Sequence, residues 1–193
     1  MRGSHMAVLD NKDVLTTDVK LKSNAPYFSN RSASGKFQKR YLGVQFFELS
    51  FNVQFQSEHI NQVQRFIALY QHGRVFDFPM SYAGEYKGTA QGIISSVSNN
   101  LPGSRQVTLG VFTGTLEAGT LVQFQNHGKL YTVQEDVKSG GTLKLFPALM
   151  GQVQAGEQIT YRNPKGKFVL TNESFDFDIK SLSQINFKAT EKI

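Results

Sequence analysis

The clearest pattern along the chain is an alternation of apolar and polar positions within residues 41–56. Apolar side chains occupy every second position from Phe47 to Phe55, and polar side chains stand between them. Successive side chains of a strand point to opposite faces, so a period of two predicts a strand with one buried face. The adjacent pair Phe46 and Phe47 predicts a bulge or a change of register near the start of this strand.

The pattern then changes to a helical period. The apolar stripe consists of Ile60, Val63, Ile67 and Tyr70, which recur at the spacings of one helix face. Ser57 stands where an N-cap is expected, and His72-Gly73 follows the stripe as a helix end does. These signals predict a helix of about 15 residues that packs on the neighbouring sheet.

Short strands separated by glycine-containing turns are predicted after the strand Arg74–Phe78, which stops at Pro79. The predicted strands are Gly92–Val97, Arg105–Phe112, Thr120–Gln125, Lys129–Gln134, Thr142–Phe146 and Glu157–Tyr161. Hairpin turns are expected at 126–128 and 138–141, where Gly and Asn accept positive φ. Strands at this spacing, with no helix among them, predict a small closed barrel.

The last part of the chain returns to longer alternation. Strands are predicted at 168–170, 175–180 and 185–188, and the apolar positions Phe175, Phe177 and Ile179 match the pattern of 47–55. We expect these strands to rejoin the sheet formed by residues 41–78.

The expected fold is mainly β (α+β) and is built from an interrupted chain. Residues 41–88 plus 164–193 form a β-sandwich-like domain with one helix, and residues 89–163 form an inserted OB-like β-barrel. Residues 7–40 form an N-terminal arm, with an edge strand at Asp18–Lys22 and loops at 23–26 and 30–35. Residues 1–6, Met-Arg-Gly-Ser-His-Met, are read as an expression tag.

Composition supports a β-rich protein with many turns, since the chain has 16 Phe, 7 Tyr and 17 Gly. The absence of Cys excludes disulfides and thiolate chemistry. No apolar run approaches the roughly 18 residues of a membrane helix, so no membrane insertion is expected.

The net charge is basic and partly local. Removing Arg2 with the tag changes the formal charge from +6 to +5. Arg31, Lys36, Lys39 and Arg40 occur in ten residues without an acid. We interpret this run as a solvated arm or a basic rim at a subunit contact. Specific nucleic-acid recognition is not expected, because no recognition helix or aromatic RNA-binding motif accompanies the charge.

Catalytic constellations are not found in the sequence. His59 and His72 are too far apart around one helix to share a metal, and His127 is expected at a solvated hairpin tip. Asp176 and Asp178 are expected on the solvent face of a strand, and Glu135-Asp136 lack the spacing of an EF-hand. Ser32-Ala33-Ser34-Gly35 is not a nucleophile elbow, and no phosphate-binding loop is present. We therefore expect no enzyme activity, no cofactor and no metal, and we assign no catalytic residue.

A carbohydrate-binding module is the main alternative from the residues themselves. Small barrels bind sugars or oligonucleotides on one face, and Tyr82, Tyr86 and Phe112 are the candidate stacking residues. Trp is absent, and core or interface use of the three rings is the favoured interpretation.

The order of motifs from Arg40 to Gly88 resembles a known family. A basic segment precedes Gly43 and the aromatic strand, the helix ends in Gly73-Arg74, and Phe76-Asp77-Phe78-Pro79 leads to Tyr82-Ala83-Gly84. Further on, residues 142–149 and Arg162-Asn163-Pro164 continue the likeness. This order resembles the distal tail proteins, and related minor tail proteins, of tailed bacteriophages. Phe46 or Phe47 stands where the family usually has Trp.

The resemblance implies a structural protein of the virion. Six copies would form a homohexameric ring in the tail tip or baseplate, joining the tail tube to the distal tip, after assembly in the host cytoplasm. Its partners would be further copies of itself, the tube protein and hub proteins, with a weak carbohydrate contact as a possible extra. The basic arm would cross to a neighbouring subunit or face the lumen through which DNA passes. The alternatives are a carbohydrate- or host-surface-binding module of a tail, or a tail tube or terminator protein.

Overall fold

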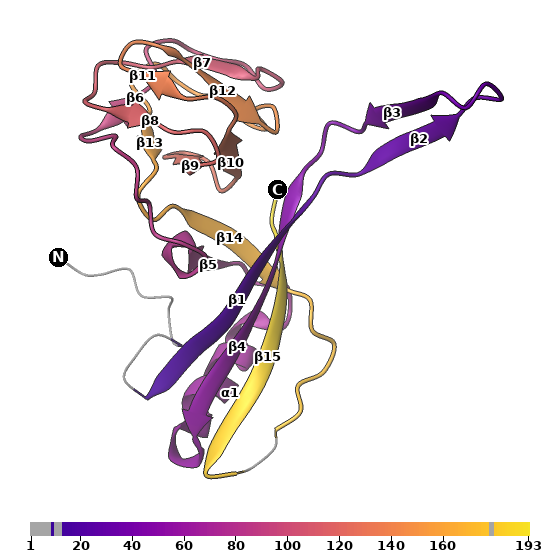
Figure 1. Cartoon of the computed structure of the whole chain (residues 1–193). Helices are drawn as coiled ribbons and strands as arrows, with labels where there is room; N and C mark the ends of the chain where they lie inside the picture. Colours follow the sequence, from indigo (N-terminus) through magenta and orange to yellow (C-terminus); the bar gives the residue numbers. More distant parts are fainter. Residues whose placement is uncertain (1–8, 10–12, 178–179) are drawn as a thin grey trace.

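The fold is mainly β with one α-helix in the described part of the chain. The computed structural model describes residue 9, residues 13–177 and residues 180–193, of which 46% are strand and 9% helical (Figure 1). The predicted tag at 1–6 lies outside these residues. No helix of the described residues is both long and apolar enough to cross a membrane.

The first unit is built on a five-stranded antiparallel sheet. In spatial order its strands are β1 (Val14–Asn24), β4 (Phe46–Gln56), β15 (Leu182–Glu191), β14 (Lys165–Leu170) and β5 (Phe76–Pro79). β15 pairs with β4 over nine residues, from Leu182 opposite Gln56 to Thr190 opposite Glu48. The predicted return of the C-terminal strands to the first sheet is therefore confirmed.

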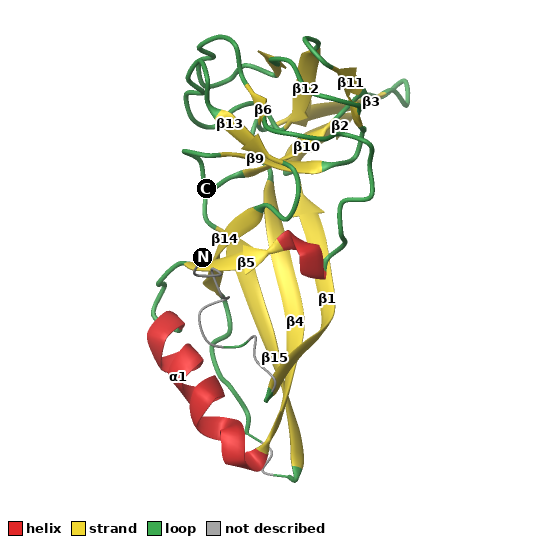
Figure 2. Cartoon of the chain, turned by 90° about the vertical axis from the view of Figure 1, so that its left-hand side faces the viewer, coloured by secondary structure: helices red, strands yellow, loops and turns green. Residues whose placement is uncertain are grey.

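Helix α1 (Ile60–Tyr70) covers one face of this sheet (Figure 2). Phe66 of the helix meets Phe187 of β15 edge-on at 5.5 Å, and Phe187 stacks on Phe51 of β4 at 5.3 Å. All three rings are buried, as the alternation along β4 and the helical stripe require.

The opposite face of the sheet carries polar side chains in place of a second layer. Asn186 donates to Asn52 at 2.7 Å, and Gln54 donates to Gln184 at 3.2 Å, across the β4–β15 pair. This face is open in Figure 2. Amide pairs suit a solvated sheet face, because the NH₂ group of one side chain donates to the oxygen of the other without adding charge, and water can meet the remaining donors and acceptors.

Several sequence-based boundaries differ from the structure. The helix is preceded by a 3-10 turn, η1 (Ser57–His59), which Gln56 precedes, so the N-cap predicted at Ser57 is wrong. β4 begins at Phe46 and pairs regularly there. The irregularity lies instead in β1, between Thr17 and Lys20, where Asp18 has φ +52°.

The strand predicted at 175–180 is also wrong for its described residues. Phe175 and Phe177 lie in an irregular segment and pack against the sheet core from there, and Asp178 and Ile179 lie outside the described residues. An apolar alternation reports which side chains are buried, and a packed loop satisfies the same pattern.

The second unit is a six-stranded curled sheet. In spatial order its strands are β6 (Ile94–Ser95), β13 (Gln158–Thr160), β9 (Leu121–Phe124), β10 (Leu130–Val133), β12 (Thr142–Phe146) and β7 (Gln106–Thr108), with the small pair β8 (Thr115–Leu116) and β11 (Val137–Lys138) beside them. The Ser96–Leu109 bridge and the hydrogen bond from Gly110 N to Ser95 O at 2.8 Å join the segments of β6 and β7. These bonds close the sheet around a core of its own. The predicted strand Arg105–Phe112 is shorter, since β7 ends at Thr108 and the chain continues from there only through the isolated bridges at Leu109 and Thr113.

The barrel is inserted between two paired strands of the first unit. The chain leaves the sheet at β5, passes the 3-10 turn η2 (Met80–Tyr82), and returns at β14, where Lys165 pairs with Pro79. The two crossings therefore lie side by side.

The segment predicted as an N-terminal arm divides into an edge strand and a hairpin. β1 is the edge strand expected at Asp18–Lys22, extended at both ends. β2 (Tyr27–Arg31) and β3 (Phe37–Tyr41) pair only with each other among the described residues, and they project away from both units (Figure 1).

Truncating Phe187 to Ala tests the packing of the first core. We expect Phe187→Ala to lower the free energy of unfolding by about 3–5 kcal/mol, because it leaves a cavity between Phe51 and Phe66. Denaturant unfolding measures this. Leu182→Ala, at the exposed start of the same strand, is the control and should cost less than about 0.5 kcal/mol. Equal losses in the two variants would contradict the packing described.

A candidate interaction hairpin and its buried anchor

The β2–β3 hairpin is a regular antiparallel ribbon. Tyr27 stands opposite Tyr41, and Arg31 stands opposite Phe37. The turn is closed by the Ser32 hydroxyl, which accepts from Lys36 N at 3.1 Å, and by Gly35, whose φ of +80° suits a residue without Cβ. The ribbon is thus well defined along its length, although nearly all its side chains are exposed.

The hairpin exposes aromatic side chains together with cations. Phe28 is 66% exposed and Phe37 is 57% exposed. Phe28 stands directly opposite Arg40, and Lys39 Nζ lies 3.6 Å from the centre of the Tyr27 ring. A two-stranded hairpin is only marginally stable in water on its own. Exposing apolar rings on it is unfavourable unless a partner covers them. This composition is typical of an interface, in which aromatic residues and Arg are enriched.

The charge of the segment has one sign. From Val19 to Phe47 there are six cations and no acid, the cations being Lys20, Lys22, Arg31, Lys36, Lys39 and Arg40. Lys22 is paired with Glu48 at 3.1 Å, so the remaining positive charge is concentrated on the projecting part. A partner surface for this hairpin should therefore carry acids.

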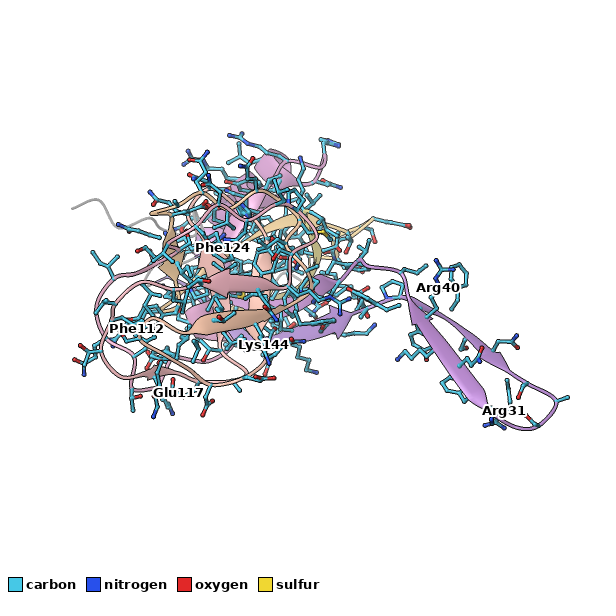
Figure 3. All side chains as sticks on the ribbon, turned by 90° about the horizontal axis from the view of Figure 1, so that it is seen from above. Arg31, Arg40, Phe112, Glu117, Phe124 and Lys144 are labelled. Atoms are coloured by element: carbon cyan, nitrogen blue, oxygen red, sulfur yellow. The ribbon has the colours of Figure 1, made fainter. Side chains whose placement is uncertain are left out.

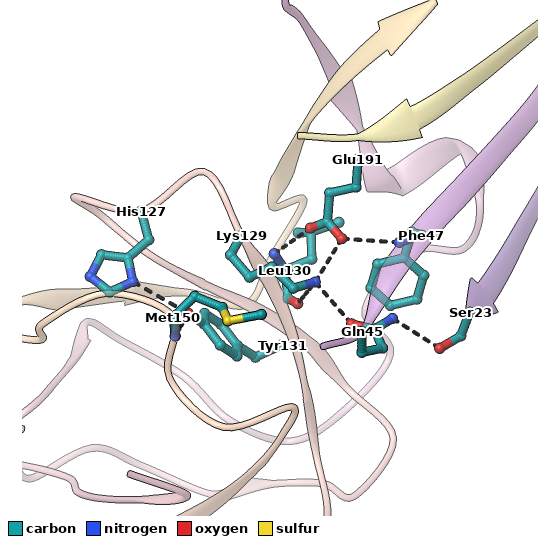
Figure 4. Close-up of polar contacts among 9 residues, drawn as sticks. All are labelled: Ser23, Gln45, Phe47, His127, Lys129, Leu130, Tyr131, Met150 and Glu191. Atoms are coloured by element: carbon teal, nitrogen blue, oxygen red, sulfur yellow. Dashed lines mark hydrogen bonds and ion pairs between the residues drawn. The ribbon is translucent and has the colours of Figure 1, made fainter. Parts of the chain in front are cut away.

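A buried ion pair lies at the root of the hairpin (Figure 4). Lys129 of the barrel contacts Glu191 of β15 at 2.6 Å, and both side chains are buried. Glu191 also accepts from Leu130 N at 2.8 Å and from Phe47 N at 3.1 Å. All three donors reach one carboxylate, so this group links the barrel to the two central strands of the sheet.

The same network extends into both ends of the hairpin. Lys129 donates to Gln45 Oε1 at 2.9 Å, and Gln45 Nε2 donates to Ser23 Oγ at 2.9 Å. Ser23 precedes the hairpin and Gln45 follows it. The Tyr41 ring packs against Phe146 of the barrel at 5.8 Å, and burial raises the pKa of Tyr41. These contacts fix the direction in which the hairpin projects.

The buried position of Lys129 is balanced by charge. Burial lowers the pKa of its ammonium group, and Glu191 opposes that shift by favouring the charged form. Lys129 also lies 5.1 Å from the centre of the Phe47 ring. The sequence shows no signal for this pair, since its members are 62 residues apart and only the topology brings them together.

A second polar cluster lies where the chain enters the barrel. Glu117 accepts from the Tyr86 hydroxyl at 2.6 Å and from Thr89 N at 2.7 Å. These bonds lower the pKa of Glu117 to about 2, the Tyr86 contact contributing most. Burial and the Glu117 bond raise the pKa of Tyr86 to about 12. Because this pKa lies far below 7, Glu117 keeps its negative charge at neutral pH.

The three predicted candidate histidines lie in separate places. His59 is at the helix start, 3.2 Å from Glu58 Oε1, and His72 is exposed beyond the helix end. His127 was expected to be solvated but is half-buried, and its Nε2 lies 2.9 Å from Gln152 O. Among the described residues, no group of three or more His, Asp or Glu side chains is arranged to hold a metal ion.

The candidate acids are also separate. Glu135 pairs with Lys144 at 2.7 Å, and Asp136 accepts from Ala118 N at 2.8 Å. Asp176 is exposed in the irregular segment before β15, and its predicted neighbour Asp178 lies outside the described residues. The Ser32–Gly35 run forms the hairpin turn.

The three candidate sugar-stacking rings are engaged within the molecule. Phe112 is buried in the barrel core, and Tyr82 packs against Phe78 at 5.5 Å. Tyr86 meets Tyr161 edge-on at 5.1 Å, with the Arg162 guanidinium 5.7 Å from its ring centre. These contacts favour the core and interface interpretation over an open stacking platform.

No protein-family model matches the chain, and no curated protein matches it.

Removing the charge of Glu191 tests the buried anchor. We expect Glu191→Gln to cost about 3–5 kcal/mol of stability, because Lys129 is left buried without its counter-charge. Denaturant unfolding measures this loss. The matched control is Glu135→Gln, which breaks the exposed pair with Lys144 and should cost less than about 1 kcal/mol. The double variant K129M/E191Q should be more stable than E191Q alone, and a strictly additive double variant would contradict the coupling.

The acid stability of the chain tests the Glu117 cluster. The pKa of Glu117 is about 2 in the folded chain against an ordinary 4.5, so its contribution is present above pH 4.5 and is lost as the pH falls toward 2. Glu117→Gln should therefore lose less stability than the parent chain between pH about 6 and about 3. Thermal unfolding at each pH measures this, with Glu135→Gln as control. Parallel pH curves for parent and E117Q would exclude the linkage.

Proposed function

We propose that this protein is a structural subunit of the tail of a tailed bacteriophage, one that forms a closed, homohexameric ring in the tail tip. The observation that carries the proposal is the β2–β3 hairpin, a rigidly rooted ribbon with exposed Phe28 and Phe37 beside cations. The order of sequence motifs that resembles the distal tail proteins supplies the assignment to a tail.

The shape of the chain supports head-to-tail assembly. The hairpin and the barrel project to opposite sides of the junction between the units (Figure 1). A surface that projects from one side of a subunit contacts a different surface of the next subunit, and such heterologous contacts close into rings when the rotation allows. β1 is a long edge strand of the sheet and offers backbone groups for the same purpose.

A ring closes only if the angle between neighbouring subunits is constant, so each subunit needs rigid contacts between its own parts. Glu191 binds groups from β4 and from β10, and Gln45 connects this carboxylate's partner, Lys129, to the hairpin root. The direction of the hairpin is thereby coupled to the sheet and the barrel, as ring closure requires.

The alternatives predict other behaviour. A carbohydrate- or host-surface-binding module needs an accessible aromatic platform, and Tyr82, Tyr86 and Phe112 are each packed against neighbours. A tail tube or terminator protein would also form a ring. Cryo-microscopy of virions separates it from a tip protein by the position of the ring along the tail.

Light scattering on the purified chain tests ring formation. Above the dissociation constant we expect a species of about 130 kDa, six times the 21.6 kDa chain. The double variant F28S/F37S should remain a monomer, because it removes the exposed rings of the hairpin. The matched control L101S/L182S removes two equally exposed apolar side chains elsewhere and should assemble normally. A parent chain that stays monomeric at millimolar concentration would overturn the proposal.

A further inference from the structure

The barrel carries an exposed apolar strip along the line where it closes. Gln91 bridges Thr113 and Ser96 bridges Leu109, so residues 91–96 run antiparallel to 109–113. Ile93 lies two residues after Gln91, and Val111 lies two residues before Thr113, so both flank the first bridge from the same side. Val111 is 89% exposed, and Ile93 and Val97 are also exposed. We call the surface formed by Ile93, Val97 and Val111 the seam face.

The barrel core does not need the apolar side chains of the seam face. The alternate positions Ala90, Ile94 and Phe112 point into the barrel and are buried, so the barrel core is complete without the outer residues. Apolar side chains that are adjacent on a surface and not needed for the core indicate an interaction site.

Acids lie at one end of the same strip. Thr115 N donates to Thr89 Oγ1 at 3.1 Å, which continues the antiparallel arrangement as far as Glu117. Glu117 is anionic at neutral pH, and Asp136 lies beside it, bound to Ala118 N. The strip therefore offers apolar contacts in its middle and, at its end, the carboxylates of Glu117 and Asp136, with one cation, Lys138, opposite Thr115.

The hairpin has the complementary pattern. Phe28 and Phe37 are its exposed rings, and its cations Arg31, Lys36, Lys39 and Arg40 face no acid on the same ribbon. Its strands have five residues, or about 17 Å in length, which is similar to the span of the seam. Aromatic residues on aliphatic ones, with opposite charges beside them, are the composition of a specific interface.

The hairpin cannot reach the seam face of its own chain. Seen from above, Phe112 and Glu117 lie on the side of the barrel that faces away from the hairpin, and Arg31 lies at the opposite end of the molecule (Figure 3). The complementary surface is therefore available only in a second copy.

We infer that the β2–β3 hairpin of one copy docks on the seam face of the next copy, with its rings over Ile93 and Val111 and its cations toward Glu117. This inference rests on the proposed ring, for which it names the contact surface. Each copy in a closed ring makes the contact twice, once through its hairpin and once through its seam face. A weak single contact then suffices, because closure makes the last one intramolecular.

Disulfide capture tests the docking directly, since the sequence contains no Cys. Chains carrying Phe28→Cys are mixed with chains carrying Val111→Cys and oxidised at a concentration at which the parent assembles. We expect a disulfide-linked dimer on a non-reducing gel, and we expect a reductant to convert it to monomer. The matched control replaces V111C by L182C, which is exposed (60%) at the far end of β15 and should link at least ten-fold less.

A charge variant gives an independent measurement. Val111→Lys places a cation where the basic hairpin is inferred to dock, and we expect at least a ten-fold rise in the dissociation constant of assembly. Leu101→Lys, on another exposed part of the barrel, should leave that constant unchanged. Circular dichroism should be the same for both, because neither side chain is buried.

The outcomes separate this inference from the proposed ring. Assembly without F28C–V111C capture, or with V111K unchanged, overturns the docking site and leaves the ring standing. A monomeric parent chain overturns both. A monomeric chain that binds a DNA duplex, and loses that binding on R31E/R40E, would assign the hairpin to nucleic acid and overturn the inference.

Discussion

The contact on which the arrangement of the chain depends is the buried pair between Lys129 and Glu191. One carboxylate accepts bonds from the barrel strand β10, from the sheet strand β4 and from the Lys129 ammonium. Two charges in an apolar junction are stable only together, so the pair penalises any arrangement that separates barrel from sheet. A purely apolar junction would bind as well but would tolerate sliding, because apolar contacts have no required direction.

The same contacts hold the hairpin in one direction, which makes it better suited to bind a partner. A two-stranded ribbon on flexible ends would lose much conformational entropy on binding. Here Ser23 and Gln45 hold the two ends together and join them to Lys129, and Tyr41 rests on Phe146. The ribbon is therefore set in its direction before any partner arrives. Its exposed rings and unbalanced positive charge suit a partner surface that is apolar with acids beside it, as the inferred seam face with Glu117 at the end of its strip is.

The residues that stabilise the fold are different from the residues that are exposed for contact with a partner. The sheet with its helix buries the aromatic core around Phe51, Phe66 and Phe187, and the barrel buries a second core that is closed by its own strands. Neither core needs the hairpin or the seam face for its packing. Those surfaces can therefore be adapted to a partner without cost to the stability of either unit, which is the condition under which exposed apolar residues are retained.

Local patterns along the sequence determined the strand β4, the helical stripe of α1, the edge strand at Asp18–Lys22 and the succession of short barrel strands. These follow from periods of two and 3.6 and from glycine at the turns, which act within a few residues. The same reasoning missed the hairpin strands β2 and β3, because an exposed ribbon has no buried face and so no apolar alternation. It also placed a strand at 175–180, where Phe175 and Phe177 are partly buried and pack on the core from a loop. Only the tertiary structure brought Glu191 to Lys129 and Gln91 to Thr113, since each contact joins distant segments that no local pattern brings together.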